Sequence, residues 1–253
     1  MPKQSLSRPV AIPASPVFTE FEGEDFWQVP GYHRNLPHWR LAGAIYFVTF
    51  RLADSIPASV VMRWQQEEAV WLQSQGIHQD WRHQDKERFV MALRQIPLSE
   101  RQGFERKQTR KFFVELDQCH GLCVLKEARA AQSVADALHF FHGQRLWLGD
   151  FVIMPNHVHV MVQMFEGCPL EEWLYSVKRF SARQLLKEQF LKTSPVTRAG
   201  HLWQTESFDR IIRNRDELNR TRDYIQKNPA KLKPGSFMHH KAAWLDEVQE
   251  QEL

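Results

Sequence analysis

Several features of secreted and membrane-embedded proteins are scarce in this 253-residue sequence. Three cysteines are too few, and odd in number, for a disulfide framework, which favours a reducing cytoplasm. No apolar run reaches about 18 residues, so no membrane span is expected. The Pro- and Ser-rich start lacks the apolar core of a signal peptide. We therefore expect a cytoplasmic globular protein, and its net charge of only +3 is a weak indication of nucleic-acid binding.

The order of apolar patterns predicts the fold class. Strands are expected at 44–52, 145–154, 157–164 and 201–212, with helices at 126–142 and 169–192. This order, strand, helix, strand, strand, helix, strand, predicts an α+β fold with a ferredoxin-like βαββαβ antiparallel sheet and helices on one face. A further helix at 216–228 is expected beyond the sheet, and Pro229 marks its end.

The remaining segments predict the domain organisation. Residues 1–40 are interrupted by prolines and are expected to form an irregular leader. Residues 41–236 form the main domain, with a charged helical insertion at about 53–124. Residues 237–253 form a C-terminal tail with a short helix.

Two histidines occupy one side of the predicted strand at 157–164. Residues i and i+2 of a strand point to the same face, so Val158 and Val160 share a core face and His157 and His159 share the other. Two neighbouring imidazoles can hold one metal ion, although a lone His-Val-His is more often an ordinary strand pair. Two histidines with one side-chain amide, for which Asn228 is the candidate, would suit Mg²⁺ or Mn²⁺, and a chance Zn²⁺ equally well.

A tyrosine and an asparagine share one side of the predicted helix at 216–228. Tyr224 and Asn228 are four residues apart and therefore project together. A helix across the histidine face would bring the Asn228 oxygen and the Tyr224 phenol to the metal. Phenol is a weak nucleophile at its ordinary pKa, so its target must be activated, as a divalent ion activates a phosphodiester. The periodicity does not show that the two faces meet.

Basic residues are concentrated in two stretches of the chain. Residues 178–198 contain six basic side chains and one acidic one, and residues 208–233 contain eight and four. Such a surface suits a phosphate backbone, although solvated helix faces give the same pattern. The residues predicted to bind DNA are Lys178, Arg179, Arg183, Arg210 and Arg213.

Four motifs together resemble one protein family. MPNHVHVMV looks like the metal-binding signature of HUH nucleases, and YIQKNP is similar to the tyrosine helix of the single-tyrosine HUH transposases, the insertion-sequence transposases. The segment LWQTESFD and the strand YFVTFRL resemble the REP-associated tyrosine transposases within that family. The similarity extends over roughly residues 40–236, and the long segment at 53–124 departs from the compact members.

The resemblance implies a function and a set of site residues. Such enzymes bind a single-stranded DNA hairpin, then cleave and rejoin one strand through a 5′-phosphotyrosine intermediate. Tyr224 would be the nucleophile, and His157, His159 and Asn228 would bind Mg²⁺ or Mn²⁺. The alternatives are another HUH endonuclease, such as a replication initiator or relaxase, and a hairpin-binding protein without nuclease activity. The sequence leaves open the hairpin recognised and whether the protein is a monomer or a homodimer.

Overall fold

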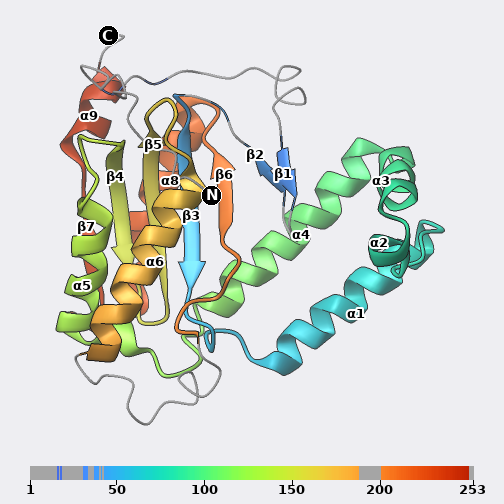
Figure 1. The fold of residues 1–253 in the computed structure, drawn as a ribbon, viewed down its shortest axis with the longest axis horizontal. Coiled ribbons are helices and arrows are strands. Elements are labelled where there is room, and N and C mark those ends of the chain that lie inside the picture. The colour runs from blue at the N-terminus through green and yellow to red at the C-terminus, as the bar shows by residue number, and fades with distance from the viewer. Residues whose placement is uncertain are drawn as a thin grey trace, which may run out of the picture. The chain divides into compact units, whose positions relative to one another are not determined.

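The computed structural model describes residues 31–33, 37–39, 43–187 and 201–250, together with Pro16, Phe18 and Leu41. These residues divide into two compact units, one of Met1–Ala53 with Cys123–Leu253 and one of Asp54–Leu122 (Figure 1). Most of the predicted leader, the end of the helix predicted at 169–192 and the loop that follows it lie outside the described residues.

The first unit is built on a five-stranded antiparallel sheet. In spatial order its strands are β6 (Phe208–Ile211), β3 (Ile45–Arg51), β5 (His157–Met164), β4 (Leu146–Ile153) and β7 (Met238–His240). Helix α5 (Ala128–His139) connects β3 to β4 along the chain, and α6 (Leu170–Lys187) connects β5 to β6. The ferredoxin-like α+β fold predicted from the sequence is therefore confirmed.

Helices α5 and α6 cover one face of this sheet (Figure 1). The alternation along β5 points Val158 and Val160 to that face, where they share one core with Val134 of α5 and Val177 of α6. Both β5 valines are completely buried. Burying a side chain of this size contributes roughly 1.5–3 kcal/mol, so this layer holds the sheet rigid beneath its other face.

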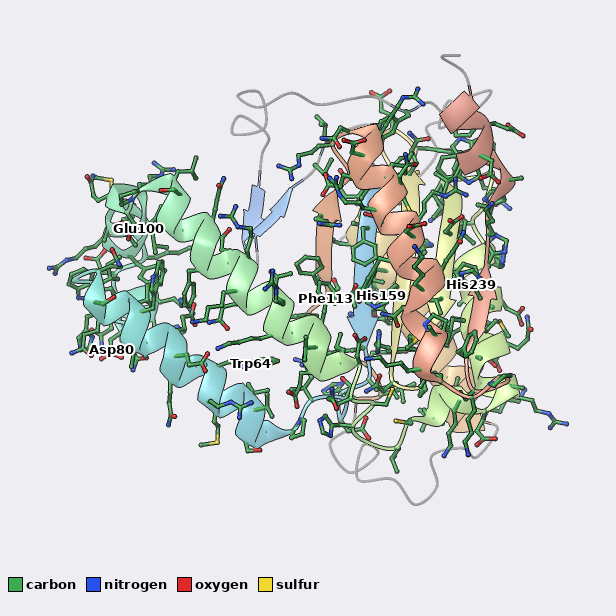
Figure 2. All side chains as sticks on the ribbon, turned by 180° about the vertical axis from the view of Figure 1, so that it is seen from behind. Trp64, Asp80, Glu100, Phe113, His159 and His239 are labelled. Carbon is green, nitrogen blue, oxygen red and sulfur yellow. The ribbon has the colours of Figure 1, made fainter. Side chains whose placement is uncertain are left out.

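Helix α8 (Arg215–Lys227) lies over the opposite face of the sheet, as the view from behind shows (Figure 2). It begins at Asn214, whose side chain accepts a hydrogen bond from the Glu217 amide and so caps the helix. After Lys227 the chain tightens into a short 3-10 turn at Asn228–Lys231. The bounds agree with the prediction of a helix at 216–228 to within one residue.

The C-terminal part of the chain closes the edge of the sheet beside β4. Strand β7 pairs with β4 and is followed by α9 (Ala243–Glu250). A β-bulge in β4 shifts the register between Leu148 and Phe151. Gly149 lies in this bulge, where a Cβ would stand 2.9 Å from Met161 Cβ and 3.1 Å from Leu245 Cδ1. A glycine is therefore needed here because a Cβ would collide with Met161 of the neighbouring strand β5.

The second unit is a helical segment within the chain of the first. It contains α1 (Ala58–Ser74), α2 (Trp81–Gln84), α3 (Lys86–Gln95) and α4 (Leu98–Leu116). A small core of its own contains Leu72, Ile77, Phe89 and Ile96. These helices fall in the segment for which a helical insertion is predicted.

Part of the predicted leader is paired rather than irregular. Strands β1 (Gly31–His33) and β2 (Pro37–Trp39) form a two-stranded antiparallel sheet. Proline is tolerated here because it stands first in β2, where a ladder amide is not required. Among the described residues, no helix has both the length and the apolar character needed to cross a membrane.

Candidate active site

The two predicted metal ligands lie side by side on the sheet face that α8 covers. A tight turn precedes β5, in which the Met154 amide donates to the His157 carbonyl at 2.8 Å. His157 and His159 are both completely buried. Their Nε2 atoms are 3.0 Å apart, so the two rings point to the same place. Figure 2 shows His159 on the sheet beside α8.

A neighbouring side chain orients each imidazole through its other nitrogen. Nδ1 of His157 is 2.7 Å from Asn156 Oδ1, which only accepts, so this nitrogen carries the proton and Nε2 presents a lone pair. Nδ1 of His159 is 2.7 Å from the Thr49 hydroxyl, which can accept in the same way. Thr49 is the cross-strand partner of His159 between β3 and β5. Such outer contacts fix the tautomer and direction of metal-binding histidines.

Burial keeps both imidazoles in the neutral form. It lowers the pKa of His157 to about 3. The pKa of His159 also lies well below the ordinary value, first because of burial and second because of the neighbouring His157. A neutral imidazole is the form that binds a metal ion. The pair is therefore ready to accept a cation at neutral pH without first losing protons.

Tyr224 reaches the histidine pair from α8. Its hydroxyl lies 3.3 Å from Nε2 of His159, and the two rings meet at 63° with their centroids 5.2 Å apart. Phe47 of β3 contacts both rings, stacking on His159 and meeting Tyr224 edge to face. The helix face and the strand face identified from the sequence thus come together, and Tyr224 is half-buried between them.

Asn228 stands at the end of the same helix, four residues after Tyr224. Its amide donates to the Tyr224 carbonyl, which continues the helix by one residue. The residue is half-buried, and its side-chain oxygen is shielded from solvent. Among the described residues no group of three or more His, Cys, Asp and Glu side chains could hold a metal ion. Any ion bound by the histidine pair would therefore take its other ligands from amide or hydroxyl oxygens, water or substrate.

A buried ion pair, which the sequence analysis missed, joins α8 to the sheet. Arg222 Nε lies 2.9 Å from Asp150 Oδ2, and Asp150 is completely buried in the bulge of β4. One signal of it was present in the sequence. Asp150 interrupts the apolar strand RLWLGDFVIM, and a carboxylate in such a strand requires a buried partner.

The residues predicted to bind DNA fall on two faces of the sheet. Lys178, Arg179 and Arg183 belong to α6, on the face opposite Tyr224. The Lys178 ammonium donates to the carbonyls of Gln204 and Thr205, so it ties a loop to the helix. Arg179 and Arg183 are exposed.

Arg210 and Arg213 lie on the tyrosine side. Arg210 is the cross-strand partner of Phe47, which places it on the histidine face. Both arginines form ion pairs with the buried Glu217 of α8, at 3.2 Å each, and Arg210 also donates to Thr221 at 3.1 Å. Arg210 therefore contributes to the attachment of α8 as well as to the local charge.

The LWQTESFD segment, residues 202–209, connects the layers of the first unit. Trp203 is buried, packs edge to face on Phe50 of β3 and donates from its indole nitrogen to the Ser181 hydroxyl of α6 at 3.0 Å. Phe208 then begins β6. In this structure the tryptophan of the motif packs in the core, and it is not part of the histidine site.

Comparison with known proteins shows that this site lies in a segment similar to transposases. Residues 137–228 match the family model described as "Transposase IS200 like", a range that begins in α5 and ends at Asn228. A protein of Haemophilus influenzae named "Putative REP-associated tyrosine transposase" is 33% identical over 86 residues, which cover 31% of this chain and 47% of that protein. The chain thus spans about half the length of this relative.

Among solved structures, that of a REP-associated tyrosine transposase bound to a REP hairpin is similar to this chain. Its TM-score is 0.35 at 13% identity, and the match covers 79% of this chain and 72% of that one. The family match and the curated relative confirm, for the segment they cover, the resemblance to tyrosine transposases that the motifs indicated.

Proposed function

We propose, from the match of residues 137–228 to the IS200-like transposases, that this protein is a transposase that acts on DNA hairpins with a single-stranded flank. It cleaves and rejoins one strand with the aid of a divalent metal ion. The observation that carries the proposal is the contact between two segments far apart in sequence, with the Tyr224 hydroxyl 3.3 Å from His159 Nε2. A protein that only binds hairpins has no need of this contact.

The donor set fits a divalent ion. The two Nε2 atoms are 3.0 Å apart, and when both Nδ1 atoms carry the proton each Nε2 offers a lone pair to one cation. Ligands at right angles in an octahedral Mg²⁺ site, each about 2.1 Å from the ion, are also about 3 Å apart. His157 and His159 would hold Mg²⁺ or Mn²⁺, and Asn228 would add a neutral oxygen. The bound ion would supply Lewis-acid polarisation of the scissile phosphate.

Tyr224 is the nucleophile in this proposal. Its oxygen attacks the phosphorus, the bond from phosphorus to the 3′ oxygen breaks, and the 5′ phosphate remains on the tyrosine. The phenol proton passes to solvent, and the leaving 3′ oxygen gains a proton to become a hydroxyl. The number of phosphoester bonds does not change. Attack by a 3′ hydroxyl on the phosphotyrosine therefore rejoins a strand without an external energy source.

The test is to look for the covalent adduct on a hairpin with a single-stranded flank. Each DNA end is labelled in turn, and products are separated by denaturing electrophoresis in the presence of Mg²⁺ or Mn²⁺. The wild type should retain the 5′-phosphate fragment on protein, and the peptide carrying Tyr224 should hold it by mass spectrometry. Tyr224→Phe should lose both adduct and cleavage while hairpin affinity changes less than about twofold, because only a hydroxyl is removed.

Tyr175→Phe is the matched control. Tyr175 is 62% exposed on α6, on the opposite face of the sheet, so its loss should affect neither cleavage nor the adduct. Cleavage by the wild type without an adduct would contradict the tyrosine mechanism and indicate attack by water. Hairpin binding with no cleavage in either metal ion would favour a non-catalytic hairpin-binding protein.

A further inference from the structure

The tyrosine helix is attached to the sheet by a charge pair that the proposed chemistry does not use. Arg222 precedes Tyr224 by two residues and is buried, with 7% of its side chain exposed. Its Nε donates to Asp150 Oδ2 at 2.9 Å. Asp150 has no exposed surface, so this bond is fully shielded from water.

A hydrogen bond and a second ion pair extend this pair to the C-terminal helix. Asp150 Oδ1 accepts from the Ala242 amide at 2.8 Å, just before α9 begins. Nη2 of Arg222 lies 2.8 Å from Asp246 Oδ1 on α9. The planar guanidinium therefore connects β4, α8 and α9, with two of its nitrogens directed at two different carboxylates.

The guanidinium of this cluster stays charged despite its burial. Burial alone would disfavour the charged guanidinium, but hydrogen bonds and charge from Asp150 and Asp246 outweigh it, so the pKa of Arg222 is raised. Burying an ion pair contributes little net stability when compared with apolar packing. Its bonds are directional, however, whereas apolar side chains permit a helix to turn on the surface beneath it.

Because Arg222 and Tyr224 belong to the same helix, the directional bonds of Arg222 affect where the Tyr224 side chain points. At 100° per residue, Tyr224 and Arg222 lie on opposite flanks of the fully buried Ile225. A phenol oxygen stands about 9 Å from a helix axis, so a rotation of roughly 10° moves it by about 1.5 Å. Misplacement by about 1 Å can slow a reaction on the order of a hundredfold.

We propose that Arg222 is a positioning residue, whose bond to Asp150 fixes the rotation of α8 and so holds the Tyr224 hydroxyl at His159. This inference rests on the proposed function only in so far as Tyr224 is the nucleophile. The placement of the phenol can be measured without any cleavage.

The experiment compares the wild type with Asp150→Asn, Arg222→Gln and the double variant that combines them. The double variant leaves no unpaired buried charge, so it is the one most certain to fold. Proximity of the two rings is read as an NMR Overhauser effect between Tyr224 and His159 in protein with labelled rings. Thermal unfolding, hairpin affinity and Mn²⁺ affinity are measured in parallel, followed by the single-turnover rate of cleavage.

The double variant should unfold cooperatively and bind hairpin within about threefold of the wild type. It should still bind Mn²⁺ through the two histidines of β5, weakened at most by the displacement of Asn228 on α8. It should lose the Overhauser effect and cleave at least tenfold more slowly at saturating DNA. Each single variant should be about as slow as the double, because the two residues act as one unit. Arg222→Lys keeps a charge that reaches one carboxylate, so it should recover part of the rate.

The matched control is the ion pair between Lys227 and Asp223, at 2.7 Å on the exposed side of the same helix. Asp223→Asn with Lys227→Gln should change neither the Overhauser effect nor the rate. A folded double variant that keeps the effect and the wild-type rate would overturn the positioning role. If the wild type shows the effect but does not cleave, the proposed function is wrong, whereas loss of the effect in the double variant would still support the positioning role.

Discussion

The Tyr224 hydroxyl lies 3.3 Å from Nε2 of His159, although 65 residues separate them in the chain. His159 belongs to the central strand of a rigid sheet, and Tyr224 to a helix attached over that sheet. The contact places a weak nucleophile beside the nitrogen that would hold the metal ion. Four predictions test separate parts of this arrangement.

The first prediction concerns the histidines as ligands. His157→Ala and His159→Ala should each weaken Mn²⁺ binding at least tenfold and abolish strand cleavage, because either change removes one of two converging nitrogens. Hairpin affinity without metal should change little. Isothermal titration with Mn²⁺ and a cleavage assay measure the two effects, and His78→Ala, a histidine whose side chain is 66% exposed, is the control. Full cleavage by either site variant would refute the ligand assignment.

The second prediction concerns Thr49. Its hydroxyl is 2.7 Å from Nδ1 of His159, so Thr49→Val should free the ring to turn and should lower Mn²⁺ affinity by about tenfold to a hundredfold. The fold should persist because valine suits a buried strand. Thr49→Ser restores a hydroxyl and should recover most of the affinity. If valine and serine give the same affinity, the hydroxyl has no orienting role.

Sequence periodicity was sufficient to predict the two halves of the site. His157 and His159 share a face because a strand repeats every two residues, and Tyr224 and Asn228 share one because a helix repeats about every four. The order of strands and helices gave the ferredoxin-like sheet and indicated which of its faces was left for α8. These are local patterns, and the structure places Tyr224 at the histidine face as expected.

Other parts of the site depend on contacts that no local pattern contains. Thr49 is an ordinary strand residue until the register of β3 and β5 pairs it with His159. Asp150 and Arg222 are 72 residues apart, and their contact depends on how α8 lies over the irregular part of β4. Strand β7 has three residues, too few to show alternation. The charge of Arg179 is visible in the sequence, but the side of the sheet on which it lies is not.

The third prediction concerns acid stability of the metal-free protein. Burial lowers the pKa of His157 from 6.5 to about 3, and that of His159 in the same direction. Between these values the unfolded chain binds protons that the folded protein does not. The free energy of unfolding should therefore fall as pH falls below about 6.5, by up to about 1.4 kcal/mol per pH unit for each histidine.

Urea unfolding at several pH values between about 4 and 7, at one ionic strength, measures this slope. Carboxylates also titrate in the acid part of the range, so the comparison is with His157→Gln and His159→Gln combined. That variant should show a shallower loss of stability from pH 6.5 downward. Equal slopes in the two proteins would mean that the histidines are not buried in the neutral form.

The fourth prediction separates DNA affinity from chemistry. Arg179 and Arg183 are exposed on α6, across the sheet from Tyr224, so they can contact phosphates without touching the reacting group. Changing both to Gln should weaken hairpin binding and reduce the slope of log affinity against log salt by about 1.4 to 1.8, as expected for two lost phosphate contacts. The single-turnover rate at saturating DNA should stay within about twofold of the wild type. Arg210→Gln should instead slow the single-turnover rate and leave the salt slope nearly unchanged. Arg210 lies on the histidine face and bonds to Thr221 of the tyrosine helix. A salt slope unchanged by the double substitution would exclude α6 from the DNA-binding surface.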